Sequence, residues 1–138
     1  METMPDPKPL RTDAVLPVEG RVVLLGSRCR ECGQVLFPRY ATCLACDGAS
    51  VEALEFAGTA TLVSWTRVHM PTMRMQAPFD AGYVRLTEGP LIYAPVRAAP
   101  AAPFRVDLPM RVVPLMLGEG DDAVCGYQFA ASSEGPHA

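Results

Sequence analysis

Cys29-Arg30-Glu31-Cys32 and Cys43-Leu44-Ala45-Cys46 are two Cys-x-x-Cys motifs, and ten residues separate them. Each motif places two thiolates on one tight turn, and the short link allows the two turns to face each other. Four sulfurs arranged in this way supply all the ligands of a tetrahedral ion, as in closed structural zinc sites. The motifs therefore predict a zinc ribbon that organises the protein and leaves no coordination position for a substrate. Iron uses the same four ligands and stays open as the alternative metal.

Two other uses of these cysteines fit the sequence less well. A redox Cys-x-x-Cys normally lies at the start of a helix in a thioredoxin-like unit, and no such unit is visible. Disulfides are rare in the cytoplasm, where closely spaced cysteines bind metal instead. The sequence shows no signal-peptide pattern and no apolar run near the ~20 residues of a membrane helix, so we expect a cytoplasmic chain without a membrane segment. The fifth cysteine, Cys125, lies on a predicted strand and is expected to fill the core.

Composition favours a small protein made of short strands. The 138 residues are 49% hydrophobic, which is enough for a packed core, and they include 14 Pro and 11 Gly, which favour strands and turns over long helices. The net charge of −3 argues against a chain whose main task is to grip a nucleic-acid backbone.

Hydrophobic patterning predicts strands on both sides of the second Cys-x-x-Cys turn; each of these two turns is called a knuckle below. Gly33 and Gly48 follow the knuckles, where glycine suits a positive φ. One long strand is expected over 53–69, bent at Gly58, and residues 70–79 read as a loop. The other predicted strands cover 21–26, 34–38, 81–86, 91–96, 110–117 and 124–130. From 53 onward these make five strands with no convincing helix, which predicts a small closed barrel.

The order of these parts resembles one family, the rubredoxin-like zinc ribbon plus OB-fold proteins, known as domain-of-unknown-function family thirty-five. The resemblance spans roughly residues 21–130. It rests on Arg28–Gly33, Phe37-Pro38-Arg39, Cys43–Cys46, Gly58–His69, the hairpin 78–96 with its Glu88-Gly89-Pro90 turn, and Met110–Val113. It implies an all-β fold, with an N-terminal rubredoxin-like zinc ribbon followed by a five-stranded OB-fold barrel.

The expected domain limits follow from this reading. They are a Pro-rich N-terminal arm at 1–20, the zinc ribbon at 21–54, the OB-fold barrel at 55–131 and a C-terminal tail at 132–138. The sequence departs from the family at three places. The arm replaces a helical hairpin, Leu44 and Asp47 stand where the second knuckle usually has Pro and Gly, and Leu108-Pro109 replaces a Gly before a barrel strand.

The resemblance implies a non-catalytic accessory subunit of a thiolase-type acyl-CoA enzyme complex. Such a subunit stabilises the complex and helps to bind or gate the acyl-CoA, while the catalytic Cys and His lie on the partner chain. Small subunits of benzoylsuccinyl-CoA-type thiolases look like this chain. One alternative is an accessory subunit of a hot-dog-fold acyl-CoA hydratase or aldolase. A single-stranded nucleic-acid-binding protein is a second, and a self-sufficient enzyme ranks last because no nucleophile–base pair is evident.

The candidate residues for contact with coenzyme A or the partner are Arg28, Phe37, Arg39, Trp65, His69, Met73 and Phe79. Each has a simpler reading as well. The Arg side chains, Arg30 included, fit a solvated surface, and core packing explains Phe37 and Trp65. His69 fits a surface turn, since no partner is spaced near it. Met70, Met73 and Met75 in one loop are less easily explained, because exposed Met often marks an adaptable binding surface.

Overall fold

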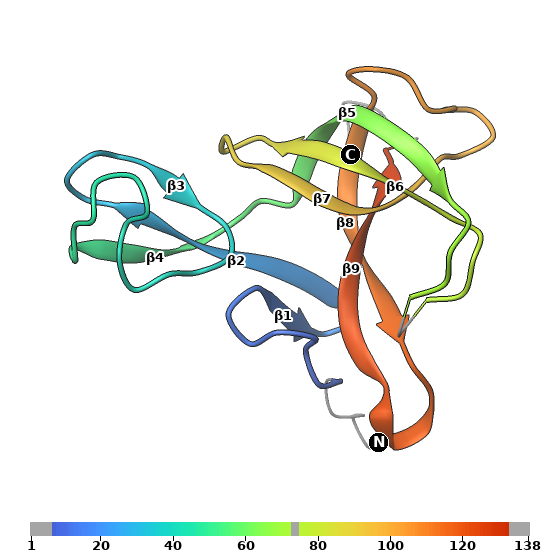
Figure 1. Ribbon diagram of the computed structural model, residues 1–138, viewed down its shortest axis with the longest axis horizontal. Helices are drawn as coiled ribbons and strands as arrows, with labels where there is room; N and C mark the ends of the chain where they lie inside the picture. The colour runs from blue at the N-terminus through green and yellow to red at the C-terminus, as the bar shows by residue number, and fades with distance from the viewer. Residues whose placement is uncertain (1–6, 73–74, 133–138) are drawn as a thin grey trace.

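The structure is a computed structural model that describes residues 7–72 and 75–132. In this part of the chain, strands are interrupted by one short 3-10 helix, η1 (Gly120–Asp122). A narrow ribbon projects from a barrel, as Figure 1 shows. The ribbon strands are β1 (Val15–Val18), β2 (Arg21–Cys29), β3 (Val35–Leu36) and β4 (Val51–Glu55). The barrel strands are β5 (Thr59–Val68), β6 (Phe79–Leu86), β7 (Leu91–Arg97), β8 (Pro109–Leu117) and β9 (Val124–Ala131).

The ribbon is organised around β2. The first half of this strand pairs with β1, from Val18↔Arg21 to Val15↔Leu24. Its second half pairs with β4 and with β3, and the β4 pairing ends at Cys29↔Val51. All three pairings are antiparallel. One strand therefore runs from the barrel to the first cysteine knuckle (Figure 1).

The five remaining strands close into a barrel in the order β5-β6-β7-β9-β8. Pairing of β5 with β8 completes the circle, and β7 with β9 is the one parallel pair. The sequence on β6 and β7 alternates with period two, so Val84, Leu86 and Ile92 point inward while Tyr83 and Tyr93 point outward. The all-β fold with a closed five-stranded barrel after the cysteine motifs confirms the predicted fold class.

The ribbon and the barrel share one hydrophobic core. Phe129, Leu62, Leu86 and Met110 of the barrel are almost fully buried, and so is Leu24 of β2 in the same cluster. Phe56, in the link between β4 and β5, belongs to that cluster and is 4% exposed. The ring of Phe37 meets Phe56 at a centroid distance of 5.9 Å and Tyr127 of β9 at 6.0 Å. These edge-to-face contacts join the two parts of the chain.

The predicted single strand over 53–69 is wrong, because the chain forms two strands in different sheets. β4 pairs with β2 of the ribbon, whereas β5 pairs with β6 and β8 of the barrel. Gly58 lies between them with a φ of 90°, and its carbonyl accepts a hydrogen bond from the Val112 N–H at 2.8 Å. The glycine therefore turns the chain from one sheet to the next instead of bending one strand.

Two other segments differ from their expected structure. The strand predicted over 34–38 is reduced to the two residues of β3, Val35–Leu36. The segment assigned to the N-terminal arm contains β1, and Ala14 and Val15 are 3% and 1% exposed. Four residues are too few to show a period in the sequence, so only the pairing with β2 reveals the strand. Residues 133–138, most of the expected tail, lie outside the described residues.

Gly26 lies where β2 passes under the Phe56 ring, and it provides the first test of the fold. A Cβ at this position would meet the Leu36 carbonyl oxygen and the Phe56 ring. Gly26→Ala is expected to lower the free energy of unfolding by about 1–3 kcal/mol, because both neighbours are packed in place. Chemical denaturation measures this. Thr61→Ala, on the exposed face of β5, is the control and should stay within about 0.5 kcal/mol of the parent.

Candidate metal centre

The four cysteine sulfurs of the two knuckles form one compact cluster. All four lie within 4.8 Å of one another, with Cys29 and Cys46 at 3.6 Å and Cys32 and Cys43 at 3.5 Å. A tetrahedral ion with Zn–S bonds of ~2.3 Å holds its sulfurs roughly 3.8 Å apart, so the cluster fits such an ion. Cys29 and Cys43 are buried, whereas Cys32 and Cys46 reach the surface. In the described part of the chain, no other group of three or more His, Cys, Asp or Glu side chains is arranged to hold a metal.

The two knuckles have the same backbone structure. In the first, the Cys29 N–H donates to the Gln34 carbonyl at 2.9 Å, and the Gly33 N–H donates to the Cys29 carbonyl at 3.0 Å. In the second, Cys43 pairs with Gly48 at 2.8 Å and Asp47 with Cys43 at 2.9 Å. Further backbone N–H groups point at the two buried sulfurs, at 3.3–3.4 Å. Each turn therefore directs both of its sulfurs into the same cluster.

The expectation that Gly48 provides the positive φ of the second knuckle is wrong. Gly33 has a φ of 79° in the first knuckle, but the matching residue of the second is Asp47, with a φ of 65°. Aspartate tolerates this left-handed region better than most residues, which is why the knuckle closes without glycine there. A Cβ at Gly48 would displace the tip of the exposed Glu31 side chain and would lie 3.3 Å from Cys46 Sγ, so the sulfur is the neighbour that limits this position.

The environment of the thiols favours a bound cation. The backbone N–H of Cys32, together with that of Glu31, lowers the pKa of Cys29 to about 7 against the opposing effect of desolvation. The Gly48 N–H works to lower the pKa of Cys46, but the neighbouring Cys29 and Cys32 thiols raise it to about 12. Thiols this close cannot all ionise together in the absence of a positive charge. A divalent cation removes this conflict and displaces the remaining protons.

The loop between the knuckles is tied to β2 by polar contacts that the sequence pattern did not reveal. The Ser27 hydroxyl donates to the Tyr40 carbonyl at 2.9 Å and accepts from the Tyr40 N–H at 3.0 Å. Ser27 is 1% exposed, so this pair satisfies a buried polar side chain. The Arg39 guanidinium donates to the carbonyls of Gly26 and Leu54 at 3.0 and 3.2 Å. Arg39 therefore braces the ribbon at its junction with the barrel.

The other residues proposed for binding do not gather at one place. Arg28 is exposed on β2 in the ribbon, and Phe37 lies at the junction. Trp65 on β5 is 41% exposed and packs on Phe104 at a centroid distance of 5.8 Å. His69 is exposed just after β5, and the half-buried Phe79 begins β6. Met73 lies outside the described residues. Binding roles for these residues stay predictions.

Replacing a knuckle cysteine tests the metal centre. Cys43→Ser is expected to abolish stoichiometric zinc and to unfold the ribbon, because the metal supplies folding free energy that so small a sheet lacks. Elemental analysis gives the metal and separates zinc from iron, and hydrogen exchange of residues 27–55 gives the fold. Cys125→Ala is the matched control. Cys125 is buried away from the cluster, so this variant should keep its zinc. Native protection in a metal-free Cys43→Ser chain would contradict the assignment.

The left-handed residue of each knuckle provides a paired test. Asp47→Gly is expected to stabilise the ribbon by up to about 1 kcal/mol, because glycine adopts a positive φ without a steric penalty. Gly33→Ala, at the matching position, is expected to destabilise it by about 1–2 kcal/mol. The readout is the chelator concentration that removes half of the zinc. Shifts of the same sign in both variants would show that backbone strain does not set ribbon stability.

Comparison with known proteins agrees with this architecture. Residues 19–52 match the rubredoxin-like zinc ribbon domain of ChsH2, and residues 54–114 match the ChsH2 C-terminal OB-fold domain. With the clustered sulfurs, the first match identifies the centre as a structural zinc site.

Two relatives and one solved structure extend the comparison. The benzoylsuccinyl-CoA thiolase subunit BbsA of Thauera aromatica is 34% identical over 92 residues, which are 66% of this chain and 63% of BbsA. This chain thus spans less than two thirds of BbsA. A DUF35 domain-containing scaffold protein of Pyrococcus furiosus is 27% identical over 111 residues, 77% of this chain and 81% of that protein. A chain of the Ltp2-ChsH2(DUF35) aldolase has the same fold, with a TM-score of 0.63, 24% identity, and coverage of 80% of this chain and 85% of that one. The chain therefore belongs to the DUF35 family, in which a rubredoxin-like zinc ribbon precedes an OB-fold domain.

Proposed function

We propose that this chain is an accessory subunit of a thiolase-type acyl-CoA enzyme complex, which it stabilises while helping to bind or gate the acyl-CoA. The observation that carries the proposal is the similarity to BbsA, a subunit of a thiolase. The relative from Pyrococcus furiosus, described as a scaffold protein, supports an architectural role. We place the complex in the cytoplasm, where reducing conditions keep thiols available for a metal.

The metal centre supports a structural role for this subunit. Its four ligands are all cysteine sulfurs, so the zinc is fully coordinated by protein and offers no position to a substrate. The knuckles are fixed to β2, and β2 is packed into the barrel core through Leu24. The ribbon is therefore a rigid projection, suited to reach a second subunit.

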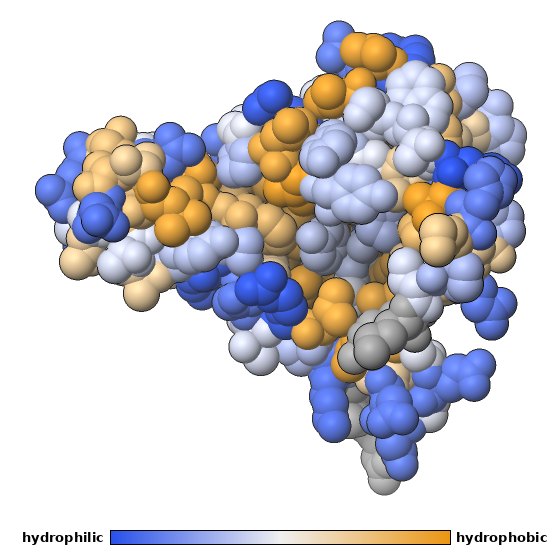
Figure 2. Space-filling model, viewed as in Figure 1, coloured by the Kyte–Doolittle hydropathy of each residue, from blue (hydrophilic) through white to orange (hydrophobic). Residues whose placement is uncertain are grey.

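The outer face of β5, β6 and β7 is the surface that best fits a partner. Val63, Tyr83, Leu91 and Tyr93 are 39%, 45%, 44% and 53% exposed on these neighbouring strands. The rings of Tyr83 and Tyr93 contact each other at a centroid distance of 5.3 Å. Aromatic residues of this kind are enriched in protein interfaces. Hydrophobic surface also reaches the projecting ribbon (Figure 2), where Leu44 is 64% exposed.

The same face favours one second candidate, binding of single-stranded nucleic acid. In the structure, the Tyr83–Tyr93 pair lies beside Arg85, which is exposed on β6. Exposed aromatic rings next to a positive charge are the stacking platform that OB folds use for bases. The net charge of −3 acts against it.

Co-purification tests the proposed function. The tagged chain, expressed in its native host, is expected to retain a thiolase-type subunit, and the purified pair is expected to turn over an acyl-CoA. The Tyr83→Ala/Tyr93→Ala variant should weaken the complex at least tenfold, because aromatic side chains at an interface centre carry much of the binding energy. Val106→Ala is the control, since Val106 is exposed in the connector before β8.

Three results would contradict the proposal. A hot-dog-fold hydratase or an aldolase as the retained subunit would move the chain to a different acyl-CoA complex. Salt-sensitive binding of a single-stranded oligonucleotide, lost in the double Tyr variant, would favour the nucleic-acid candidate. Acyl-CoA turnover by the isolated chain would show that it is itself an enzyme.

A further inference from the structure

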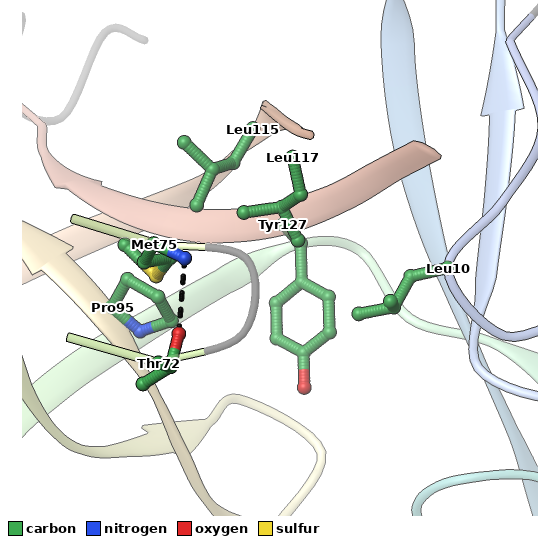
Figure 3. Close-up of a pocket in the computed structure, with 7 residues that line it drawn as sticks. All are labelled: Leu10, Thr72, Met75, Pro95, Leu115, Leu117 and Tyr127. Atoms are coloured by element: carbon green, nitrogen blue, oxygen red, sulfur yellow. Dashed lines mark hydrogen bonds between the residues drawn. The ribbon is translucent and has the colours of Figure 1, made fainter. Parts of the chain in front are cut away.

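An apolar pocket opens on the side of the barrel formed by β7, β8 and β9. Its volume is about 310 Å³. That is roughly twice the ~150 Å³ of an apolar protein cavity that holds benzene. Leu115 and Leu117 of β8 form one wall and Pro95 of β7 another, as Figure 3 shows. The space therefore suits an alkyl or aryl group of moderate size.

The remaining walls come from two segments outside the barrel sheet. Leu10 is held in place because its N–H donates to the Cys125 carbonyl at 2.8 Å, and the Cys125 N–H donates to the Lys8 carbonyl at 2.7 Å. Across from it, Thr72 and Met75 are joined by hydrogen bonds of 2.9 and 3.0 Å (Figure 3). The Leu10 wall is thus tied to β9, and the opposite wall is held by hydrogen bonds within its own loop.

Tyr127 brings a second hydroxyl to this largely apolar lining, besides that of Thr72. Its ring stands between Leu10 and Pro95, with the hydroxyl at the free end (Figure 3). The ring is held from behind by Phe37 and Phe129, at centroid distances of 6.0 and 6.4 Å. Within the described residues, the hydroxyl donates to no protein acceptor. Desolvation raises the pKa of Tyr127 against the opposing effect of Arg11, so the hydroxyl stays protonated at neutral pH and can donate a hydrogen bond.

We infer that this pocket binds the acyl group of a coenzyme A thioester, with Tyr127 donating a hydrogen bond to the thioester carbonyl. The inference rests on the proposed function, which brings an acyl-CoA to the complex. An apolar lining that includes the Tyr127 donor matches an acyl chain that carries a carbonyl, while the second hydroxyl of the lining, that of Thr72, is engaged by the Met75 N–H. The apolar walls hold the chain, and the tyrosine fixes the depth at which it enters.

Titration of the zinc-loaded full chain with acetyl-, butyryl-, hexanoyl- and octanoyl-CoA tests this inference, with unacylated CoA as the reference. Calorimetry is expected to show affinity rising by up to about fourfold per added methylene until the pocket is full, and then levelling off. Tyr127→Phe keeps the ring packing and should weaken every acyl-CoA by about two- to tenfold, with unacylated CoA unaffected.

Two substitutions at Leu115 make the test specific. Leu115→Trp fills the space and should remove the chain-length dependence. Leu115→Ala enlarges it and should move the levelling-off point to a longer chain. Val106→Trp, at an exposed site away from the pocket, is the matched control and should bind as the parent does. Zinc content and thermal midpoint identify any variant that misfolds. If Leu115→Trp misfolds, the Leu115→Ala and Tyr127→Phe variants still test the inference.

Affinity that is independent of chain length, or unchanged in Leu115→Ala and Tyr127→Phe, would overturn the inference. So would an absence of acyl-CoA binding combined with loss of the complex in Leu115→Trp, which would assign the pocket to a side chain of the partner. The titration contains no partner. If the chain retains a thiolase-type subunit but its affinity shows no chain-length dependence, the proposed function stands and this inference fails. If the affinity depends on chain length but no thiolase-type subunit is retained, this inference stands and the proposed function fails.

Discussion

The packing of the Phe56 ring against β2 and against Phe37 is the interaction on which the rest of the structure depends. β2 carries Leu24 into the barrel core and ends at Cys29, the first metal ligand. Gly26 lies between these two points, under the Phe56 ring, where a larger residue would not fit. The aromatic contacts continue through Tyr127 into the barrel. A displacement at this junction would therefore reach both the zinc knuckles and the barrel wall.

The zinc centre stabilises a ribbon that side-chain packing alone would not stabilise. The segment between the first knuckle and β4 buries few side chains, so hydrophobic burial contributes little to its stability. The metal joins two turns that have matching hydrogen bonds, and each turn supplies one buried and one exposed sulfur. Ser27 and Arg39 add polar contacts that tie the intervening loop to β2. The ribbon becomes a braced arm whose base shares its core with the barrel.

The barrel presents two surfaces with different chemistry. The outer face of β5, β6 and β7 exposes an aromatic pair of the kind that protein partners bury. The pocket beside Tyr127 is concave, largely apolar and lined by the Tyr127 hydroxyl, which suits a small acyl group. In a subunit of an acyl-CoA enzyme the two surfaces would act together. The first would hold the partner, and the second would receive part of the partner's substrate.

The local signals in the sequence were sufficient for the metal ligands and for the strand content of the barrel. Cys-x-x-Cys spacing determines which sulfurs share an ion, and alternation on β6 and β7 determines which side chains enter the core.

The pairing partners of the strands were not encoded locally. The split at Gly58 and the four residues of β1 both depend on hydrogen bonds to distant segments. The same holds for the bracing contacts of Arg39, whose carbonyl acceptors at Gly26 and Leu54 are far from it in sequence. The sequence by itself therefore determined the zinc site, the all-β class and the family. Only the tertiary structure decided that the ribbon and barrel share one core and that Leu10, Met75, Pro95, Leu115 and Tyr127 line one pocket, because long-range packing brings these residues together.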